Sequence, residues 1–280
     1  MEEDKAFSSI DFVGQCLVDE ERTVAFQKAI NNIVKKGDSV LDLGTGSGIM
    51  ALSAAKAGAG TVTAVEFDPF VAKIARNAIL INNLENTVSL VVDDARICDF
   101  QPNQKFDVVI SEMLTTAMVD EPQIAAINNL HDKNLVDEST IFVPCKHDTY
   151  ISLVNANFTL FGLHMPMIMH LWHWHKWSKL KIKKLTEQEL VNSISFHHKN
   201  EERFEATLSI KARKTGTVNA LYLTSKTFLS EKIVLGDTEA LNAPMLIPIS
   251  EIKLVKGQTV QLKISYTFGG GYQNFKADFI

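Results

Sequence analysis

Two successive apolar segments of the sequence end at residues that could bind a ligand. The first has an acid and leads into a glycine-rich turn, and the second ends at an acid. The first segment reads Val-Leu-Asp-Leu and runs into Gly-Thr-Gly-Ser-Gly, so that Asp42 precedes Gly44, Gly46 and Gly48. Glycines at such a turn let the backbone approach a ligand too closely for side chains. Glu66 closes the next apolar segment, where a carboxylate can accept hydrogen bonds from two ribose hydroxyls. The pattern indicates a site for a nucleotide-like ligand.

The spacing of the glycines distinguishes two classes of nucleotide cofactor. A dinucleotide fingerprint is Gly-x-Gly-x-x-Gly leading into a helix that faces a pyrophosphate, whereas here the glycines alternate and Asp42 would repel a pyrophosphate. The same carboxylate would favour a cofactor that carries an ammonium and a sulfonium. The stretch resembles the cofactor loop of the class I S-adenosylmethionine methyltransferases. S-adenosyl-L-methionine is therefore the expected cofactor, and a nicotinamide-binding Rossmann domain is the alternative.

Two acids follow the third predicted strand, which reads Val-Ser-Leu-Val-Val. Asp93, Asp94 and Ala95 come directly after it. Ligands of open α/β sheets bind beyond the carboxyl ends of the strands, so an acid here can accept a hydrogen bond from an adenine amine. We expect Asp94, with Ala95 beside it, to contact the adenine. The alternative is that both acids only begin a turn.

Two glutamates bracket the loop after the fourth predicted strand, where a substrate would meet the transferred methyl group. Glu112 begins this loop and Glu121 ends it. Two carboxylates suit a guanidinium, because that group stays cationic and presents a planar fork of donors. They would also offset the repulsion between the guanidinium and the sulfonium. Because Glu121 precedes Pro122 at an expected helix start, a role as helix cap or dipole partner is the alternative.

Composition and charge argue against several other classes of protein. A hydrophobic content of 46% in 280 residues allows a sizeable core, and a net charge of -5 argues against a general nucleic-acid binder. No apolar run approaches the ~20 residues that cross a bilayer, and the acidic N-terminus resembles neither a signal nor a transit peptide. The three cysteines are widely spaced, which fits a reducing compartment. We therefore expect a cytoplasmic protein that binds neither membranes nor nucleic acid.

The hydrophobic pattern changes near residue 145. Before it, predicted strands alternate with helices, the strands at 39–43, 61–66, 88–92, 106–111 and 140–144 and the helices at 19–34, 47–58, 69–82 and 120–131. After it, period-two alternation predicts antiparallel strands in a sandwich or barrel. We expect an α/β fold in which a Rossmann-like doubly wound sheet over residues 1–145 is followed by an antiparallel β-barrel over residues 146–280.

The loop from Glu112 to Glu121 resembles, in residues and spacing, the double-glutamate loop of the protein arginine methyltransferases. Residues 17–23 resemble the helix that this family places over its cofactor, so the resemblance assigns Arg22 to the methionine carboxylate. Residues 140–144 resemble the segment that leads into the family's β-barrel. The resemblance implies an arginine N-methyltransferase in which Glu112 and Glu121 are catalytic.

Two departures from that family bear on the substrate. Ala6 to Ile10 lacks the family's two tyrosines, and Ala240 to Pro244, the nearest counterpart of its Thr-His-Trp loop, lacks His and Trp. Three hypotheses follow: a protein or peptide arginine methyltransferase, a methyltransferase for a small guanidine or amine, and a cofactor-binding regulatory subunit without turnover.

A stretch rich in methionine and tryptophan runs from Leu163 to Trp177. The resemblance assigns it to a shortened arm that holds a partner subunit, which would make the protein a homodimer, whereas its composition fits barrel core equally well. Four histidines lie within it: His164, His170, His173 and His175. No carboxylate or cysteine completes a metal-binding spacing with them, so we expect no metal site.

Overall fold

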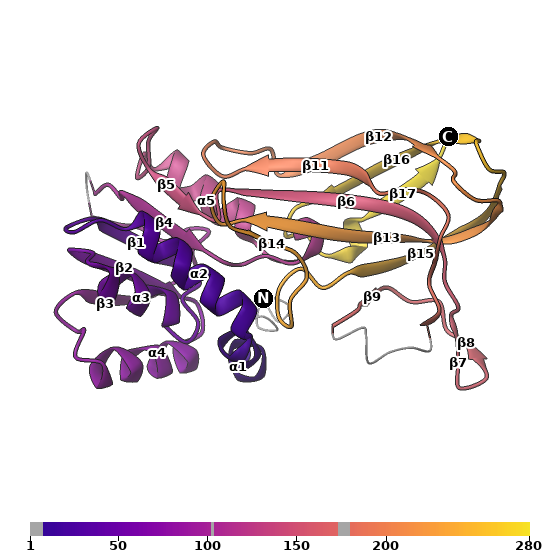
Figure 1. Cartoon of the computed structure of the whole chain (residues 1–280). Helices are drawn as coiled ribbons and strands as arrows, with labels where there is room; N and C mark the ends of the chain where they lie inside the picture. The colour runs from indigo at the N-terminus through magenta and orange to yellow at the C-terminus, as the bar shows by residue number, and fades with distance from the viewer. Residues whose placement is uncertain (1–7, 102–103, 173–179) are drawn as a thin grey trace.

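A parallel sheet forms the N-terminal half of the chain (Figure 1). The computed structural model describes residues 8–101, 104–172 and 180–280. The strands are β1 Ser39–Leu43, β2 Thr61–Glu66, β3 Val88–Val92, β4 Val108–Ser111 and β5 Ile141–Val143, in the order β3-β2-β1-β4-β5. All neighbours are parallel. The predicted α/β architecture is confirmed, and each predicted strand is found, with β4 and β5 shorter than expected.

Four helices occupy the segments predicted to be helical, namely α2 Glu20–Ile33, α3 Ile49–Ala57, α4 Pro69–Ile81 and α5 Gln123–Asp132. A fifth, α1 Ile10–Val18, was not predicted as a separate element. Asp19 separates α1 from α2, because its backbone is extended and its side chain accepts a hydrogen bond from the Arg22 N–H at 3.1 Å. Within the described ranges, no helix has both the length and the apolar character needed to cross a membrane.

The strand order brings the predicted site residues to one edge of the sheet. The chain turns in opposite directions from β1 and β4, and ligands of such sheets bind where this switch occurs. Leu43 at the end of β1 is paired with Val65 on one side and with Ser111 on the other. The glycine turn, Glu66 and Glu112 therefore emerge next to one another at the carboxyl edge.

Antiparallel strands form the C-terminal half. One sheet follows the order β10-β6-β13-β15-β9, with β11 paired to β6 and β14 to β13. Its strands are β6 Lys146–Asn155, β9 Met169–His170, β10 Lys183–Lys184, β11 Glu189–Ser195, β13 Gly216–Phe228, β14 Val234–Leu235 and β15 Met245–Leu254. A second sheet contains β12 Arg203–Lys211, β16 Thr259–Thr267 and β17 Lys276–Phe279, and a hairpin contains β7 Thr159–Leu160 and β8 Leu163–His164.

The strand pairing does not bear out the predicted barrel, although the antiparallel strands were expected. In the described part of the chain, β12, β16 and β17 pair among themselves and do not close a cylinder with the larger sheet. Apolar side chains of both sheets, such as Leu223 and Ile264, nevertheless belong to one core. Period-two alternation specifies which face of a strand is buried, but it leaves open which edges pair.

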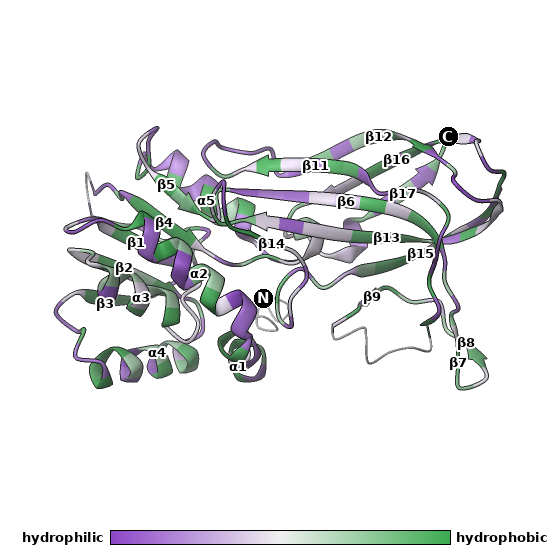
Figure 2. Ribbon diagram, viewed as in Figure 1, coloured by the Kyte–Doolittle hydropathy of each residue, from purple (hydrophilic) through white to green (hydrophobic). Residues whose placement is uncertain are grey.

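Polar contacts join the two halves beside the switch point. The carboxylate of Asp19 accepts hydrogen bonds from the Thr238 hydroxyl and, at 2.8 Å, from the Ala240 N–H. The Thr116 hydroxyl donates to the Ala243 carbonyl at 2.7 Å. Figure 2 shows that β6 is hydrophilic at its N-terminal end and hydrophobic farther along the strand. Buried polar groups thus orient one half against the other.

Replacing Asp19 with alanine should lower the free energy of unfolding by about 2–4 kcal/mol, because α2 loses its cap, and the buried Ala240 N–H and the part-buried Thr238 hydroxyl lose their acceptor. Ser9→Ala is the matched control, since Ser9 caps α1 at an exposed helix end and its loss should cost less than about 1 kcal/mol. Chemical denaturation measures both. Equal losses in the two variants would contradict the role of Asp19 between the halves.

Candidate active site

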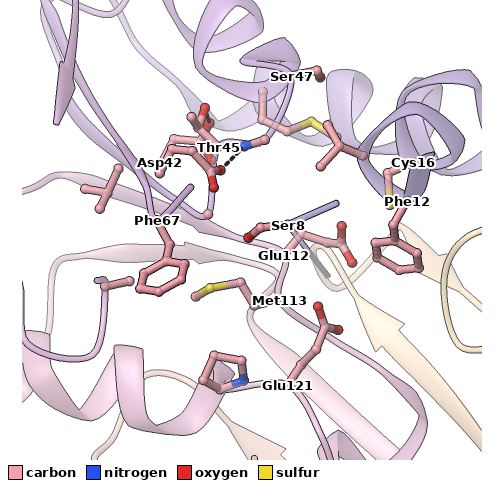
Figure 3. A pocket seen from close by; sticks show the side chains of 18 of the residues that line it. Ser8, Phe12, Cys16, Asp42, Thr45, Ser47, Phe67, Glu112, Met113 and Glu121 are labelled. Atoms are coloured by element: carbon pink, nitrogen blue, oxygen red, sulfur yellow. Dashed lines mark hydrogen bonds between the residues drawn. The ribbon is translucent and has the colours of Figure 1, made fainter. Parts of the chain in front are cut away.

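One cavity at the carboxyl edge of the parallel sheet brings together the residues predicted to be catalytic or to bind the cofactor, while Gly48 of the turn is not part of its lining (Figure 3). Its lining includes Arg22, Asp42, Gly44, Gly46, Glu66, Asp94, Ala95, Glu112 and Glu121. Helix α1 adds Phe12 and Cys16 to the wall, a contribution that was not predicted. The cavity therefore lies between the ends of the strands and the N-terminal helices.

The glycine turn adopts a backbone that other residues would strain. Gly44 has a φ of +68°, and a Cβ on it would lie 2.8 Å from Cγ of Met113. Gly46 has a φ of +55°, and its N–H donates a hydrogen bond to Glu66 Oε2 at 2.8 Å. This turn can approach a bound ligand closely because no side chain stands between them.

The Glu66 carboxylate is buried and held by the backbone. One oxygen accepts from Gly46, and the other accepts from the Asp68 N–H at 2.9 Å. Burial raises the pKa of Glu66, and these backbone donors oppose the rise. Because each carboxylate oxygen has two lone pairs, both can still accept a hydroxyl donor from a ligand.

Asp42 lies beneath the turn, is buried and lines the cavity. The Thr45 hydroxyl donates to its Oδ2 at 2.6 Å. Burial raises the pKa of Asp42 to about 7, the hydrogen bond from Thr45 lowers it, and the charge of Glu66 adds to the rise. A cationic ligand would favour the ionised form of this carboxylate.

Arg22 is buried and contacts Glu112. Its Nη2 pairs with Glu112 Oε2, and its Nη1 donates to the carbonyl of Cys16 at 2.9 Å. Burial acts to lower the pKa of Arg22, but the charge of Glu112 raises it, and the net direction is upward. Its Nε is buried and has no hydrogen-bond partner within the described residues. That donor remains free for an anionic group of a ligand.

Among the described residues, Glu121 differs from Glu112 in having no counter-ion in direct contact. It is 5% exposed, and no hydrogen bond to its carboxylate occurs within the described part of the chain. Burial raises its pKa well above the usual value, and the charges of Glu112 and Asp120 raise it further. Burial also raises the pKa of Glu112, but Arg22 opposes that rise. Figure 3 shows both side chains directed into the same space beside Phe12.

The loop between the two glutamates has a constrained backbone. Ala117 and Met118 have φ values of 64° and 50°, a region that costs non-glycine residues roughly 1–3 kcal/mol. The Ala117 N–H donates to Ser225 Oγ at 3.1 Å, and the Met118 carbonyl accepts from the Gly269 N–H at 3.0 Å. The C-terminal half therefore holds this loop in place. Neither contact was predicted.

Asp94 and Ala95 line the cavity, but Asp94 already has a partner. Arg96 donates to both of its oxygens, with Nη2 2.6 Å from Oδ2. Burial acts to raise the pKa of Asp94, yet the Arg96 hydrogen bonds hold it below its usual value. An adenine amine would share this carboxylate with Arg96.

A second polar cluster beside Glu121 escaped the sequence analysis. Asp120 accepts from the Thr115 hydroxyl, and its Oδ2 lies 3.4 Å from His170 Nε2. The hydroxyl of Tyr272, in the 3-10 turn η5 Tyr272–Asn274, hydrogen-bonds to the same nitrogen. The sequence carries no signal for this cluster because its members lie far apart along the chain. His173 and His175 lie outside the described residues, and no metal-binding group of acids, histidines and cysteines occurs among those described.

The chain is similar to known proteins in the sequence of its parallel-sheet half and in its whole fold. Residues 21–143 match the family profile of the ribosomal protein L11 methyltransferases (PrmA). An uncharacterized protein of Methanocaldococcus jannaschii is 32% identical over 262 residues, 94% of each chain. The arginine N(omega)-methyltransferase of Streptomyces achromogenes subsp. streptozoticus is 29% identical over 143 residues, 50% of this chain and 39% of the relative. A chain of the Trypanosoma brucei PRMT1 enzyme-prozyme complex with AdoHcy has a TM-score of 0.75 at 17% identity, covering 98% of both chains.

These matches and the site define a class I S-adenosylmethionine-dependent methyltransferase that resembles the protein arginine methyltransferases. The cofactor is accordingly S-adenosyl-L-methionine. Within this class, the chain belongs to the same family as the Methanocaldococcus jannaschii protein.

Glu66→Ala should weaken the binding of S-adenosylmethionine by roughly 1.5–3 kcal/mol if Glu66 accepts the ribose hydroxyls. Glu85→Ala is the control, because Glu85 is exposed in the turn before β3, at the opposite edge of the sheet. Isothermal titration calorimetry measures both dissociation constants. A Glu66→Ala variant with unchanged affinity would refute the ribose assignment.

Proposed function

We propose that the protein methylates a nitrogen of a guanidino group, with arginine in a protein or peptide as the acceptor. The observation that carries this proposal is the buried carboxylate of Glu121, which has no ionic partner among residues 8–101, 104–172 and 180–280 and faces the cavity beside Glu112. Ionising a carboxylate in such a place is costly unless a cation binds to it. A guanidinium supplies that cation at every physiological pH and can pair with two carboxylates at once.

The cofactor roles proposed from the sequence fit the cavity. The free Nε of Arg22 suits the methionine carboxylate, and Asp42 suits the cationic end of the cofactor. The closely approachable turn at Gly44 and Gly46 would contact the cofactor, and Glu66 would accept the ribose hydroxyls. Asp94 and Ala95, which line the same cavity, would contact the adenine.

The chemical step requires an acceptor nitrogen held in line with the methyl group. S-adenosylmethionine supplies an electrophilic methyl group when it is bound. Glu112 and Glu121 would hold the guanidinium by its donors, turn one nitrogen toward that methyl group and offset the positive charge. The new nitrogen–carbon bond would form as the methyl–sulfur bond breaks and S-adenosylhomocysteine leaves, and the nitrogen would release its proton to water during or after the transfer. Residues 1–145 would form the cofactor domain, and residues 146–280 would form a domain that binds substrate.

A small guanidine or amine is the second candidate acceptor. The Streptomyces relative is named an arginine N(omega)-methyltransferase without reference to protein, and the similarity to it leaves free arginine open as an acceptor. The segment from Ala240 to Pro244 favours this second candidate, because the Thr-His-Trp residues of the protein arginine methyltransferases are missing there. A panel of arginine peptides, free arginine, agmatine and simple amines, incubated with labelled S-adenosylmethionine, distinguishes these acceptors.

Glu112→Gln and Glu121→Gln should each remove most methyl transfer while leaving cofactor affinity nearly intact. Each substitution keeps the shape but leaves a bound guanidinium incompletely paired, a penalty of about 3–5 kcal/mol, or a rate loss on the order of a hundred- to several thousand-fold. Single-turnover rates measure the effect.

Glu138→Gln is the matched control, because Glu138 is exposed ahead of β5. The melting temperature of each variant separates catalysis from stability. Were Glu121 only a helix cap, its replacement would cost about 1 kcal/mol of stability and little activity. Full activity of Glu121→Gln with a lowered melting temperature would overturn the guanidinium assignment.

We also propose a homodimer that uses the β7–β8 hairpin. Phe161 is 89% exposed and Leu163 is 65% exposed, although both are large and apolar. Met165 and Met167, just beyond the hairpin, are also exposed, which disfavours barrel core for this part of the stretch. Residues 173–177 of the same stretch lie outside the described ranges. Figure 1 shows the hairpin projecting from the antiparallel sheets.

Light scattering at micromolar concentration should give twice the 31.1 kDa chain mass. Leu163→Glu should yield a monomer, because a charge would be buried in the interface. Val255→Glu should stay dimeric, since Val255 is similarly exposed at 62% but lies in the turn between β15 and β16. A monomeric wild-type protein would contradict this interface.

A further inference from the structure

Asp120 occupies an unusual position, directly before Glu121 and on the wall of the same cavity. A second carboxylate beside an unpaired buried glutamate makes that glutamate harder to ionise. A neutral residue at this position would avoid the repulsion. The charge of Asp120 therefore calls for an explanation other than packing.

Donors from three different elements surround this carboxylate. Thr115 of the same loop donates to Oδ1, and His170 of β9 places Nε2 3.4 Å from Oδ2. The Tyr272 hydroxyl of η5 hydrogen-bonds to His170 and lies close enough to Asp120 to help lower the pKa of that carboxyl. The side chains of Asp120 and His170 are 15% and 16% exposed, so water screens these contacts only weakly.

The protonation behaviour of the two neighbouring acids agrees with this geometry. Burial acts to raise the pKa of Asp120, but hydrogen bonds from His170 and Thr115 hold it below its usual value. Burial raises the pKa of Tyr272, and so does the Asp120 charge, which keeps the hydroxyl protonated as a donor. Burial raises the pKa of Glu121 well above its usual value, and the charge of Asp120 contributes to that rise.

The groups that face these two acids come from both halves of the chain. Asp120 is faced by Thr115, Glu121, His170 and Tyr272. Glu121 is faced by Cys16, Arg22, Glu112, Asp120 and Tyr272. Burial raises the pKa of Cys16 to about 12, so its thiol is uncharged near neutral pH. In the described ranges, Arg22 is the cation that opposes the acids, and it is already paired with Glu112.

We infer that His170 and Tyr272 are positioning residues that keep Asp120 ionised beside Glu121, and that the charge of Asp120 sets the pH below which Glu121 no longer holds a guanidinium. This inference rests on the proposed guanidino acceptor. As positioning residues, His170 and Tyr272 do not touch the acceptor. Both act through Asp120. Asp120 in turn acts on Glu121 through its charge.

The first test uses the ligand-free protein and needs no substrate. Titration of ¹³C-labelled aspartate and glutamate carboxyl groups by NMR, assigned with Asp120→Asn and Glu121→Gln, follows each acid separately. Tyr272→Phe should raise the titration midpoint of Asp120 by up to about one pH unit, because the Tyr272 hydroxyl acts with His170 and Thr115 to hold that pKa down. Tyr150→Phe is the matched control, since the Tyr150 hydroxyl lies 3.3 Å from Asp148 Oδ2 on β6. It should leave Asp120 unchanged, and an unchanged midpoint in Tyr272→Phe as well would overturn the inference.

The second test uses catalysis. Since Glu121 must be ionised to hold the guanidinium, kcat/KM should fall at low pH in the wild-type protein. Asp120→Asn removes the neighbouring charge, lowers the pKa of Glu121 and should move this acid limb about one unit to lower pH. A purely structural Asp120 would instead lower activity equally at every pH, which would overturn the inference.

The two tests also separate this inference from the proposed function. If the NMR shift occurs but no guanidino compound is methylated, the proposed acceptor is wrong and the coupling of Tyr272 to Asp120 stands. If guanidino compounds are methylated and neither the NMR midpoint nor the acid limb moves, the proposed function stands and the positioning role is wrong.

Discussion

An imbalance of buried charge is the constraint on which the rest of the site depends. Asp42, Glu66, Glu112 and Glu121 share one cavity, and Arg22 is the buried cation among its described lining residues. Taking carboxylates out of water costs several kcal/mol each unless donors or cations compensate. Backbone and hydroxyl donors compensate at Glu66 and Asp42. At Glu121 no such donor is found in the described structure, so its carboxyl group favours the protonated form until a cation binds beside it.

This constraint explains why the loop between the glutamates is held so firmly. A flexible loop would let Glu121 turn toward water, where its carboxylate can ionise without a desolvation penalty. Instead, the strained backbone at Ala117 and Met118 is fixed by Ser225 and Gly269 from the antiparallel half. Buried polar contacts between the halves thus keep the Glu121 carboxylate in the cavity, where its charged form is disfavoured. The antiparallel half shapes the site even though most residues expected to bind ligands belong to the parallel half.

The sequence predicted features that depend on local pattern and missed those that depend on distant partners. The alternation of apolar runs predicted β1 to β5. The positions of Gly44, Gly46 and Glu66 after two of these strands correctly predicted that the three residues lie together at the carboxyl edge of the sheet. Helix α1 was missed because its apolar residues remain partly exposed and Gly14 interrupts them. The pairing of strand edges in the antiparallel half and the contact of His170 with Asp120 join segments far apart in the chain. Such contacts leave no periodic signal.

The two glutamates look equivalent in the sequence, but their surroundings give them different chemistry. Arg22 favours the ionised form of Glu112, whereas burial and two neighbouring acids favour the protonated form of Glu121. Environments that separate the pKa values of two carboxyl groups commonly separate their roles as well. If the proposed function holds, Glu112 would link the acceptor to the residue proposed to hold the methionine carboxylate. Glu121 would then gain its counter-ion when the acceptor binds.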